Sequence, residues 1–197
     1  MRLEHLGYRF CGLVLFLLLV LTVLIANDSN QIRRLIQNTG LLACVLLACA
    51  TFVSPMQNLL PHKINAANAS SLRRCLGVSA TVVALVHLSV IFFSNYVSNV
   101  VVLITEPQFR NGSGAMLVLF ILSLSSFQKP RTFLRITKWK SLHRLLYIAL
   151  PITLLHWVSS PGYSSLDKWI SVLLIFAIIG LRILSFGKAK LNAFTSS

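Results

Sequence analysis

Three histidines, His87, His143 and His156, lie in or at the edge of long apolar stretches of the sequence. Ionisable side chains inside a bilayer are costly, and those that persist usually have a partner and a task. Histidine costs less than the others because its imidazole can be neutral, and the neutral ring carries a lone pair that suits a haem iron in an apolar pocket. The alternative is that His87 and His156 form hydrogen bonds across helices in a bundle core.

The rise of a helix predicts that His87 and His156 lie at similar depth. At about 1.5 Å per residue, His87 is about 16 Å beyond Leu76, where its apolar stretch begins. His156 is about 21 Å beyond Leu142, whereas His143 is within about 2 Å of the same residue. One metal centre can therefore be shared by His87 and His156, with His143 nearer the other membrane face.

His143 and His156 lie on one stretch but are not expected to face the same neighbour. Thirteen residues at about 100° each leave them roughly 140° apart around an ideal helix. Pro151 lies between them, and a proline kink or a π-bulge can supply the missing rotation. On this hypothesis one helix serves two stacked redox centres.

The histidines belong to a chain dominated by membrane-spanning elements. Of its 197 residues, 56% are hydrophobic and only 11% are charged, which is not the balance of a soluble domain. Six apolar runs approach the length of about 20 residues that a membrane helix needs. They are residues 10–26, 35–54, 76–93, 114–127, 142–159 and 169–186. The fourth run is short and needs flanking residues to complete a crossing. The sequence predicts an all-α, polytopic membrane protein, a single domain (1–197) with six transmembrane helices.

The positive charge predicts the orientation of this bundle. The net charge is +14, but the basic residues lie between the apolar runs and not on one face, so nucleic acid is not indicated as a partner. Most Lys and Arg residues fall in the segments 1–9, 55–75, 128–141 and 187–197, on the side where the chain begins. The positive-inside rule then places both termini in the cytoplasm.

Several motifs resemble the ferric-reductase-like transmembrane domain family. They are SLRRCLGVSATVVALVHLSVIFF at 71–93, LITEPQ at 103–108 and KWKSLHRLLYIALPITLLHW at 138–157. Within that family the chain is most similar to the haem-binding membrane subunits of bacterial periplasmic methionine-sulfoxide reductase systems, over roughly residues 35–185.

The resemblance implies roles for particular residues. His87 and His156 would be the axial ligands of a haem b, and His143 would serve a second haem or the site where electrons enter, nearer the cytoplasm. Larger family members carry paired histidines on both haem-holding helices, but the matching positions here are Arg73 and Arg74, which could instead pair with haem propionates. For the remaining matched positions, namely Thr39, Gly40, Pro55, Gly77 and Trp139, the likeness implies packing, turn and interface roles.

The resemblance also implies the protein's place in an electron-transfer chain. The donor would be a membrane quinol or a separate cytoplasmic flavin reductase. The acceptor would be a periplasmic molybdopterin-containing methionine-sulfoxide reductase, in which the sulfoxide chemistry takes place, so no catalytic residue is assigned to this chain. FMN is a further cofactor of such subunits, although no residue of the sequence places it. The expected location is the bacterial inner membrane.

Two alternatives stay open. One is a stand-alone transmembrane haem reductase that acts on ferric iron or another small acceptor. The other is a haem-free transporter or assembly subunit whose histidines relay protons or pack in the core. Against the last stands the scarcity of carboxylates within the apolar runs, since Asp28, Glu106 and Asp167 all fall in predicted loops.

Overall fold

The part of the chain that the structure describes is helical throughout. The computed structural model describes residues 29–60, 65–94, 101–126, 139, 141–160, 168–169, 172–173, 176–185 and 187. Its elements are α2 (Ser29–Leu59), α3 (Ala66–Phe93), α4 (Val102–Thr105), α5 (Pro107–Ser125), the 3-10 turn η1 (His143–Leu145) and α8 (Leu146–Ser159). A further helical stretch is Phe176–Ser185. These residues contain no strand, which confirms the predicted all-α class for them. The predicted span 10–26 lies outside the described residues.

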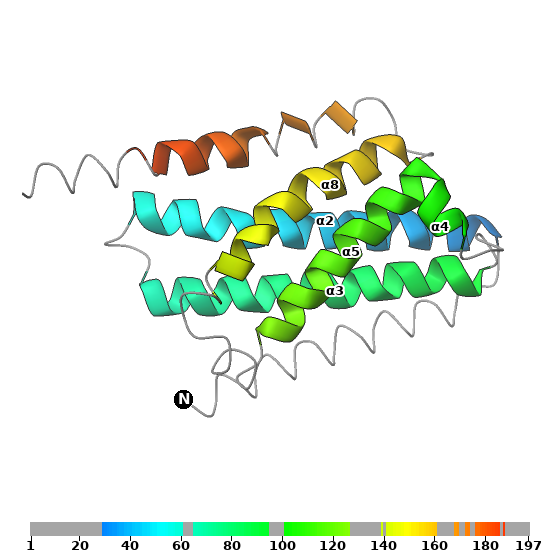
Figure 1. The fold of residues 1–197 in the computed structure, drawn as a ribbon, viewed down its shortest axis with the longest axis horizontal. Coiled ribbons are helices and arrows are strands. Elements are labelled where there is room, and N and C mark those ends of the chain that lie inside the picture. Colours follow the sequence, from blue (N-terminus) through cyan, green and yellow to red (C-terminus); the bar gives the residue numbers. More distant parts are fainter. Residues whose placement is uncertain are drawn as a thin grey trace, which may run out of the picture.

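Helices α2 and α3 form a long antiparallel pair that lies side by side (Figure 1). They contain 31 and 28 residues. At about 1.5 Å per residue, each is longer than the roughly 30 Å of a bilayer's hydrocarbon core. The segments Asn30–Leu59 and Asn68–Phe93 are both long and apolar enough to cross a membrane.

Three helices begin earlier than the apolar runs predicted. Helix α2 begins at Ser29 instead of residue 35, and α3 begins at Ala66 instead of residue 76, so Arg73 and Arg74 lie within a helix. Helix α5 begins at Pro107 instead of residue 114. A proline in the first turn loses no intrahelical hydrogen bond. Hydropathy detects only the part of a helix that lies in the apolar layer of the membrane. Backbone hydrogen bonding favours continuing the helix beyond that layer, into the headgroup region.

Helices α5 and α8 cross the first pair obliquely (Figure 1). Helix α8 packs on α5 and also contacts α2, while α5 contacts α3. Each of these two helices is shorter than α2 or α3, with 19 residues in α5 and 14 in α8. The arrangement brings His87 on α3 and His156 on α8 into one region between four helices.

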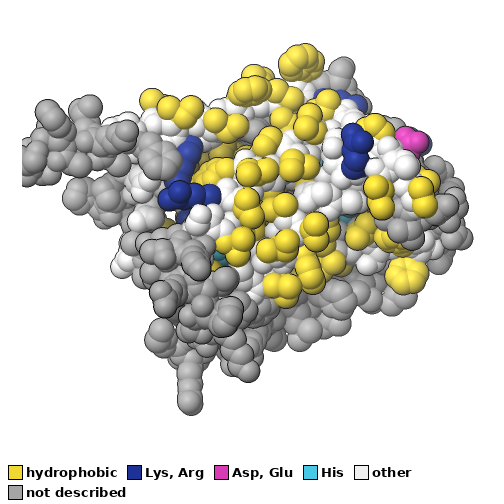
Figure 2. All heavy atoms as spheres, in the orientation of Figure 1, with side chains coloured by type: hydrophobic (Ala, Val, Ile, Leu, Met, Phe, Trp, Pro, Cys, Tyr) yellow, Lys and Arg dark blue, Asp and Glu magenta, His cyan; other side chains and the backbone are white. Residues whose placement is uncertain are grey.

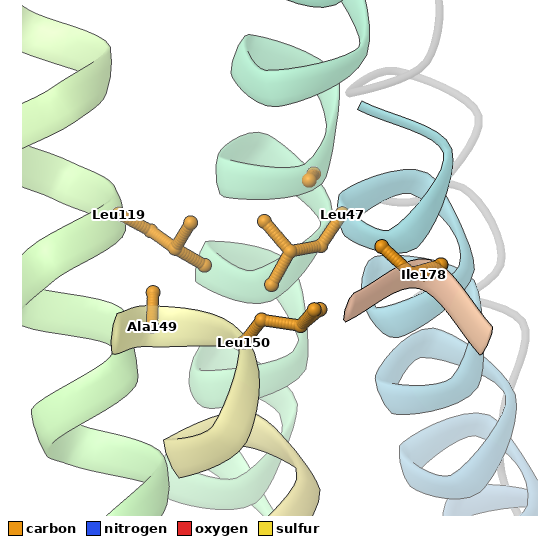
Figure 3. Packing of buried hydrophobic residues seen from close by; sticks show 6 residues of the cluster. Leu47, Leu119, Ala149, Leu150 and Ile178 are labelled. Atoms are coloured by element: carbon orange, nitrogen blue, oxygen red, sulfur yellow. The ribbon is translucent and has the colours of Figure 1, made fainter. Parts of the chain in front are cut away.

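A small apolar core holds the helices together. Its six buried members are Leu47 on α2, Ala80 on α3, Leu119 on α5, Ala149 and Leu150 on α8, and Ile178. The labelled side chains point toward one another in Figure 3. Ala80 and Ala149 are fully buried, and such small residues let helix backbones approach closely, as membrane helix pairs do.

The outer surface is apolar as well. Phe93 is 85% exposed and Ile104 is 67% exposed. Many other large hydrophobic side chains are exposed as well. Figure 2 shows hydrophobic side chains spread across the face of the bundle. Contiguous apolar surface of this extent is unfavourable in water, and it suits contact with lipid.

Candidate functional site

His87 lies directly against the backbone of α2 at Gly40. A Cβ atom added to Gly40 would lie 3.1 Å from Cε1 and 3.3 Å from Nδ1 of His87, tighter than most real contacts. The imidazole can reach the α2 backbone because residue 40 has no side chain.

This close approach determines which nitrogen of His87 carries the proton. Nδ1 lies 3.0 Å from the carbonyl oxygen of Ile36, and a carbonyl can only accept a hydrogen bond. Nδ1 therefore donates, and the lone pair is on Nε2. The hydroxyl of Thr39 lies 3.2 Å from the same Nδ1 and donates to the carbonyl of Leu35 at 2.7 Å. A second hydrogen bond of this kind is what orients histidines that bind metals.

His156 lies against α5 in the same way. A Cβ atom added to Gly112 would lie 2.9 Å from both Cε1 and Nδ1 of His156. Each histidine thus packs on a glycine of a neighbouring helix: His87 of α3 on α2, and His156 of α8 on α5. The second pairing is the tighter one.

The two histidine rings meet in the interior of the bundle. Their centroids are 6.3 Å apart and the ring planes make an angle of 75°. A cavity of about 140 Å³ lies beside both rings. Its walls are mainly aliphatic, including Leu47, Leu88 and Ile91, and Arg33 also lines it. We call it the histidine cavity.

The donor set of the histidine cavity fits a haem. The described residues contain no group of three or more His, Cys, Asp or Glu that could hold a bare metal ion. The two neighbouring imidazoles would supply the two protein nitrogens that a haem iron takes, since the porphyrin supplies the other ligands. The volume of the histidine cavity, about 140 Å³, is smaller than that of pockets for drug-sized ligands, which usually enclose about 300–1,000 Å³. A porphyrin would fit only after side chains or helices move apart.

His143 lies in a second cavity and is held by hydrogen bonding and stacking. Its Nε2 is 3.2 Å from the hydroxyl of Ser125, and that hydroxyl donates to the carbonyl of Leu122 at 2.8 Å. A hydroxyl can donate or accept, so the direction of this hydrogen bond depends on the tautomer of His143. The ring of Trp139 lies 4.2 Å from the His143 ring, and the Trp139 indole donates to the Ser125 carbonyl at 2.9 Å.

The predicted rotation between His143 and His156 is altered by a 3-10 turn. The chain forms this turn at His143–Leu145, directly before α8. Three residues of 3-10 helix add about 60° of rotation relative to an α-helix. Pro151 lies inside α8, and no π-helical residue occurs in the described ranges. The two histidines still line different cavities.

Arg73 and Arg74 line the cavity of His143 and do not line the histidine cavity. Along α3, fourteen residues separate Arg73 from His87, which corresponds to about 21 Å. A propionate of a haem centred at His87 does not extend that far. Contact between these arginines and propionates would therefore require a group bound beside His143.

The fold and the site together define a helical membrane protein with a close pair of histidines between its helices. The chain belongs to the ferric reductase like transmembrane component family, whose model matches residues 39–154. The predicted family is thereby confirmed, and it indicates a role in membrane electron transfer or reduction. The match includes His87 and His143 and ends just before His156. No solved structure matches the chain.

Sequence reasoning missed Gly112 and the position of Arg33 in the wall of the histidine cavity. Gly40 was expected to have only a packing or turn role. Glycine inside a membrane helix is a signal of close approach by another element. The sequence cannot show which residue approaches, because that depends on how the helices are rotated against one another.

Proposed function

We propose that this protein holds haem b between His87 and His156 and carries electrons across a membrane. The observation that supports this most strongly is the close pair of imidazoles, with ring centroids 6.3 Å apart and Nδ1 of His87 committed to the Ile36 carbonyl. That commitment leaves the Nε2 lone pair for a metal. When bound, haem b supplies one-electron oxidation and reduction.

The protein's own residues orient the ligands and exclude water. Gly40 and Gly112 allow the two rings to lie against neighbouring backbones. The aliphatic wall, with Leu47 and Leu88 among its members, provides a low-dielectric surrounding that tunes a redox potential. His143, which contacts Ser125 in the other cavity, would serve a second haem or the site where electrons enter.

We further propose a donor, an acceptor and an orientation. The donor is a membrane quinol or a cytoplasmic flavin reductase, and the acceptor is a periplasmic molybdopterin-containing methionine-sulfoxide reductase. FMN is an additional candidate cofactor. Support comes from the motifs at 71–93 and 138–157 and from the basic segments, which favour six helices in a bacterial inner membrane with both termini in the cytoplasm. The His143 end would then face the cytoplasm.

A second candidate is a stand-alone reductase of ferric iron or another small acceptor, which the family description favours. To separate the two, the purified protein in liposomes would be reduced with quinol and then mixed with either a molybdopterin sulfoxide reductase or ferric citrate. Reoxidation by the enzyme alone supports the first proposal, and reoxidation by ferric citrate alone supports the second. A haem-free transporter or assembly subunit would be colourless throughout.

The haem assignment is tested by a reduced-minus-oxidised spectrum with a pyridine haemochrome assay on the purified protein. His87→Ala and His156→Ala should each lose the low-spin haem b signal, because each removes one axial nitrogen. His143→Ala serves as the comparison and should keep that signal. Full haem content with unchanged spectra in both His87→Ala and His156→Ala would end the ligand assignment.

A further inference from the structure

The cavity beside His143 is larger than the histidine cavity and differs from it in charge. It has a volume of about 380 Å³, and four arginines line it: Arg73 and Arg74 of α3, Arg144 of η1, and Arg182. We call it the arginine cavity. It lies where α3 and α8 begin and α5 ends, away from the His87–His156 pair. Figure 2 shows Lys and Arg side chains at both ends of the face in view, with the acidic side chain beside the group at one end only.

Among the described residues, no carboxylate lines the arginine cavity. Glu106 is the only Asp or Glu in those residues, and it precedes the first residue of α5. The cavity lies at the other end of this helix, where Ser126 lines it. The twenty residues between them correspond to about 30 Å of helix. Arg74 and Arg182 are close enough to Arg73 for their charges to oppose its own. A bound anion would relieve this repulsion, which is strong where the walls have a low dielectric.

The arginines are positioned by contacts within the protein. Nη1 of Arg73 donates to the hydroxyl of Ser54 at 2.6 Å. The guanidinium of Arg182 lies 4.9 Å from the ring centroid of Tyr147, which is a cation–π distance. Side chains already fixed in this way lose less entropy when a ligand binds.

We propose that the arginine cavity binds a phosphate group. Guanidinium groups donate in a planar fork that matches phosphate oxygens in pairs. A phosphate monoester carries a charge of about −1.5 to −2 at neutral pH, which suits several guanidiniums better than a single carboxylate does. Ser70 and Ser123 add hydroxyl donors to the wall. The phosphate can come from a soluble phosphorylated molecule or from an anionic phospholipid headgroup.

The test is equilibrium dialysis of the haem-containing protein in detergent against radiolabelled inorganic phosphate. Arg74→Gln and Arg144→Gln should each weaken binding about tenfold or more, because each removes a charge-assisted hydrogen bond. Arg110→Gln is the matched control: it makes the same change of charge on exposed α5 surface and lines neither cavity. Arg73 is left intact because its bond to Ser54 contributes to packing.

The lipid arm compares the same variants in nanodiscs of phosphatidylglycerol and of phosphatidylcholine, with lipid phosphorus counted after delipidation. Arginine-dependent binding of inorganic phosphate supports a soluble source. Arginine-dependent retention of phosphatidylglycerol alone supports a headgroup. The proposal is overturned if neither inorganic phosphate nor phosphatidylglycerol binds, or if Arg110→Gln weakens binding as much as the other variants. It is also overturned if Arg74→Gln removes a second haem, since the cavity would then hold haem propionates. Haem content at His87 and His156 is measured separately, so the proposed function and this inference can fail independently.

Discussion

Gly112→Ala is the substitution for which the structure makes its sharpest prediction. The added Cβ would lie 2.9 Å from Cε1 and Nδ1 of His156, whereas ordinary contacts begin at 3.4 Å. The ring must therefore move by about half an ångström to restore a normal van der Waals distance. Because His156 is a proposed axial ligand, this movement should disturb the low-spin haem spectrum and lower haem content.

The magnitude follows from two opposing effects. Alanine in place of glycine inside a helix contributes about 1 kcal/mol in favour of folding, while overpacking an interior costs about 1–3 kcal/mol. Gly114→Ala is the matched control, since it lies on the same helix and a Cβ there meets nothing within 4 Å. The control should gain stability, so Gly112→Ala should unfold about 1–3 kcal/mol more readily than Gly114→Ala.

The assay is denaturation of the purified protein by SDS, together with the visible spectrum of each variant. Gly40→Ala and Gly77→Ala make a second pair on α2 and α3. The Gly40 Cβ would lie 3.1 Å from Cε1 of His87, and Gly77 is open. The Gly40 effect should have the same sign and be smaller. If both members of each pair unfold alike and keep full haem, the histidines do not pack on these glycines and the reasoning is refuted.

Three further predictions concern the hydrogen bonds around the histidines. Thr39→Val should leave the haem spectrum unchanged, because Nδ1 of His87 keeps its backbone acceptor on α2; a shifted spectrum would show that the hydroxyl orients the ring. Ser125→Ala removes the partner of His143 and should lower the free energy of unfolding in SDS by about 0.6 kcal/mol, the mean for hydrogen bonds between membrane helices. Trp139→Phe loses the indole hydrogen bond to the carbonyl of residue 125 and also changes the stacking on His143. It should therefore lower the free energy of unfolding by a similar or larger amount. An unfolding curve like that of the parent protein would contradict this prediction.

The histidine pair could be predicted because its depth depends only on helical rise. His87 and His156 were expected at similar depth from residue counts, and the structure brings their rings to 6.3 Å. The same arithmetic placed His143 far from both, and it lines a different cavity. Distances along one helix follow from sequence because the helix repeat is nearly constant.

The contacts of these histidines could not be predicted, because they depend on rotation between helices. Nothing in the sequence around Gly40 or Gly112 indicates that each lies under an imidazole. The 3-10 turn at His143–Leu145 has helical residues on both sides and no breaker residue within it, so tertiary packing must select it over a continuous α-helix. The early starts of α2 and α3 were missed because hydropathy reports lipid contact and not backbone hydrogen bonding.

One side chain of the core separates the two cavities. Leu119 of α5 lines both of them and packs with Leu47 and Leu150 in the buried cluster. A layer of aliphatic side chains offers no hydrogen bonds for a chain of water molecules, so it resists the passage of protons and ions. On the proposed function, electrons would pass this aliphatic layer by way of the bound haem, whereas the layer would block protons and ions.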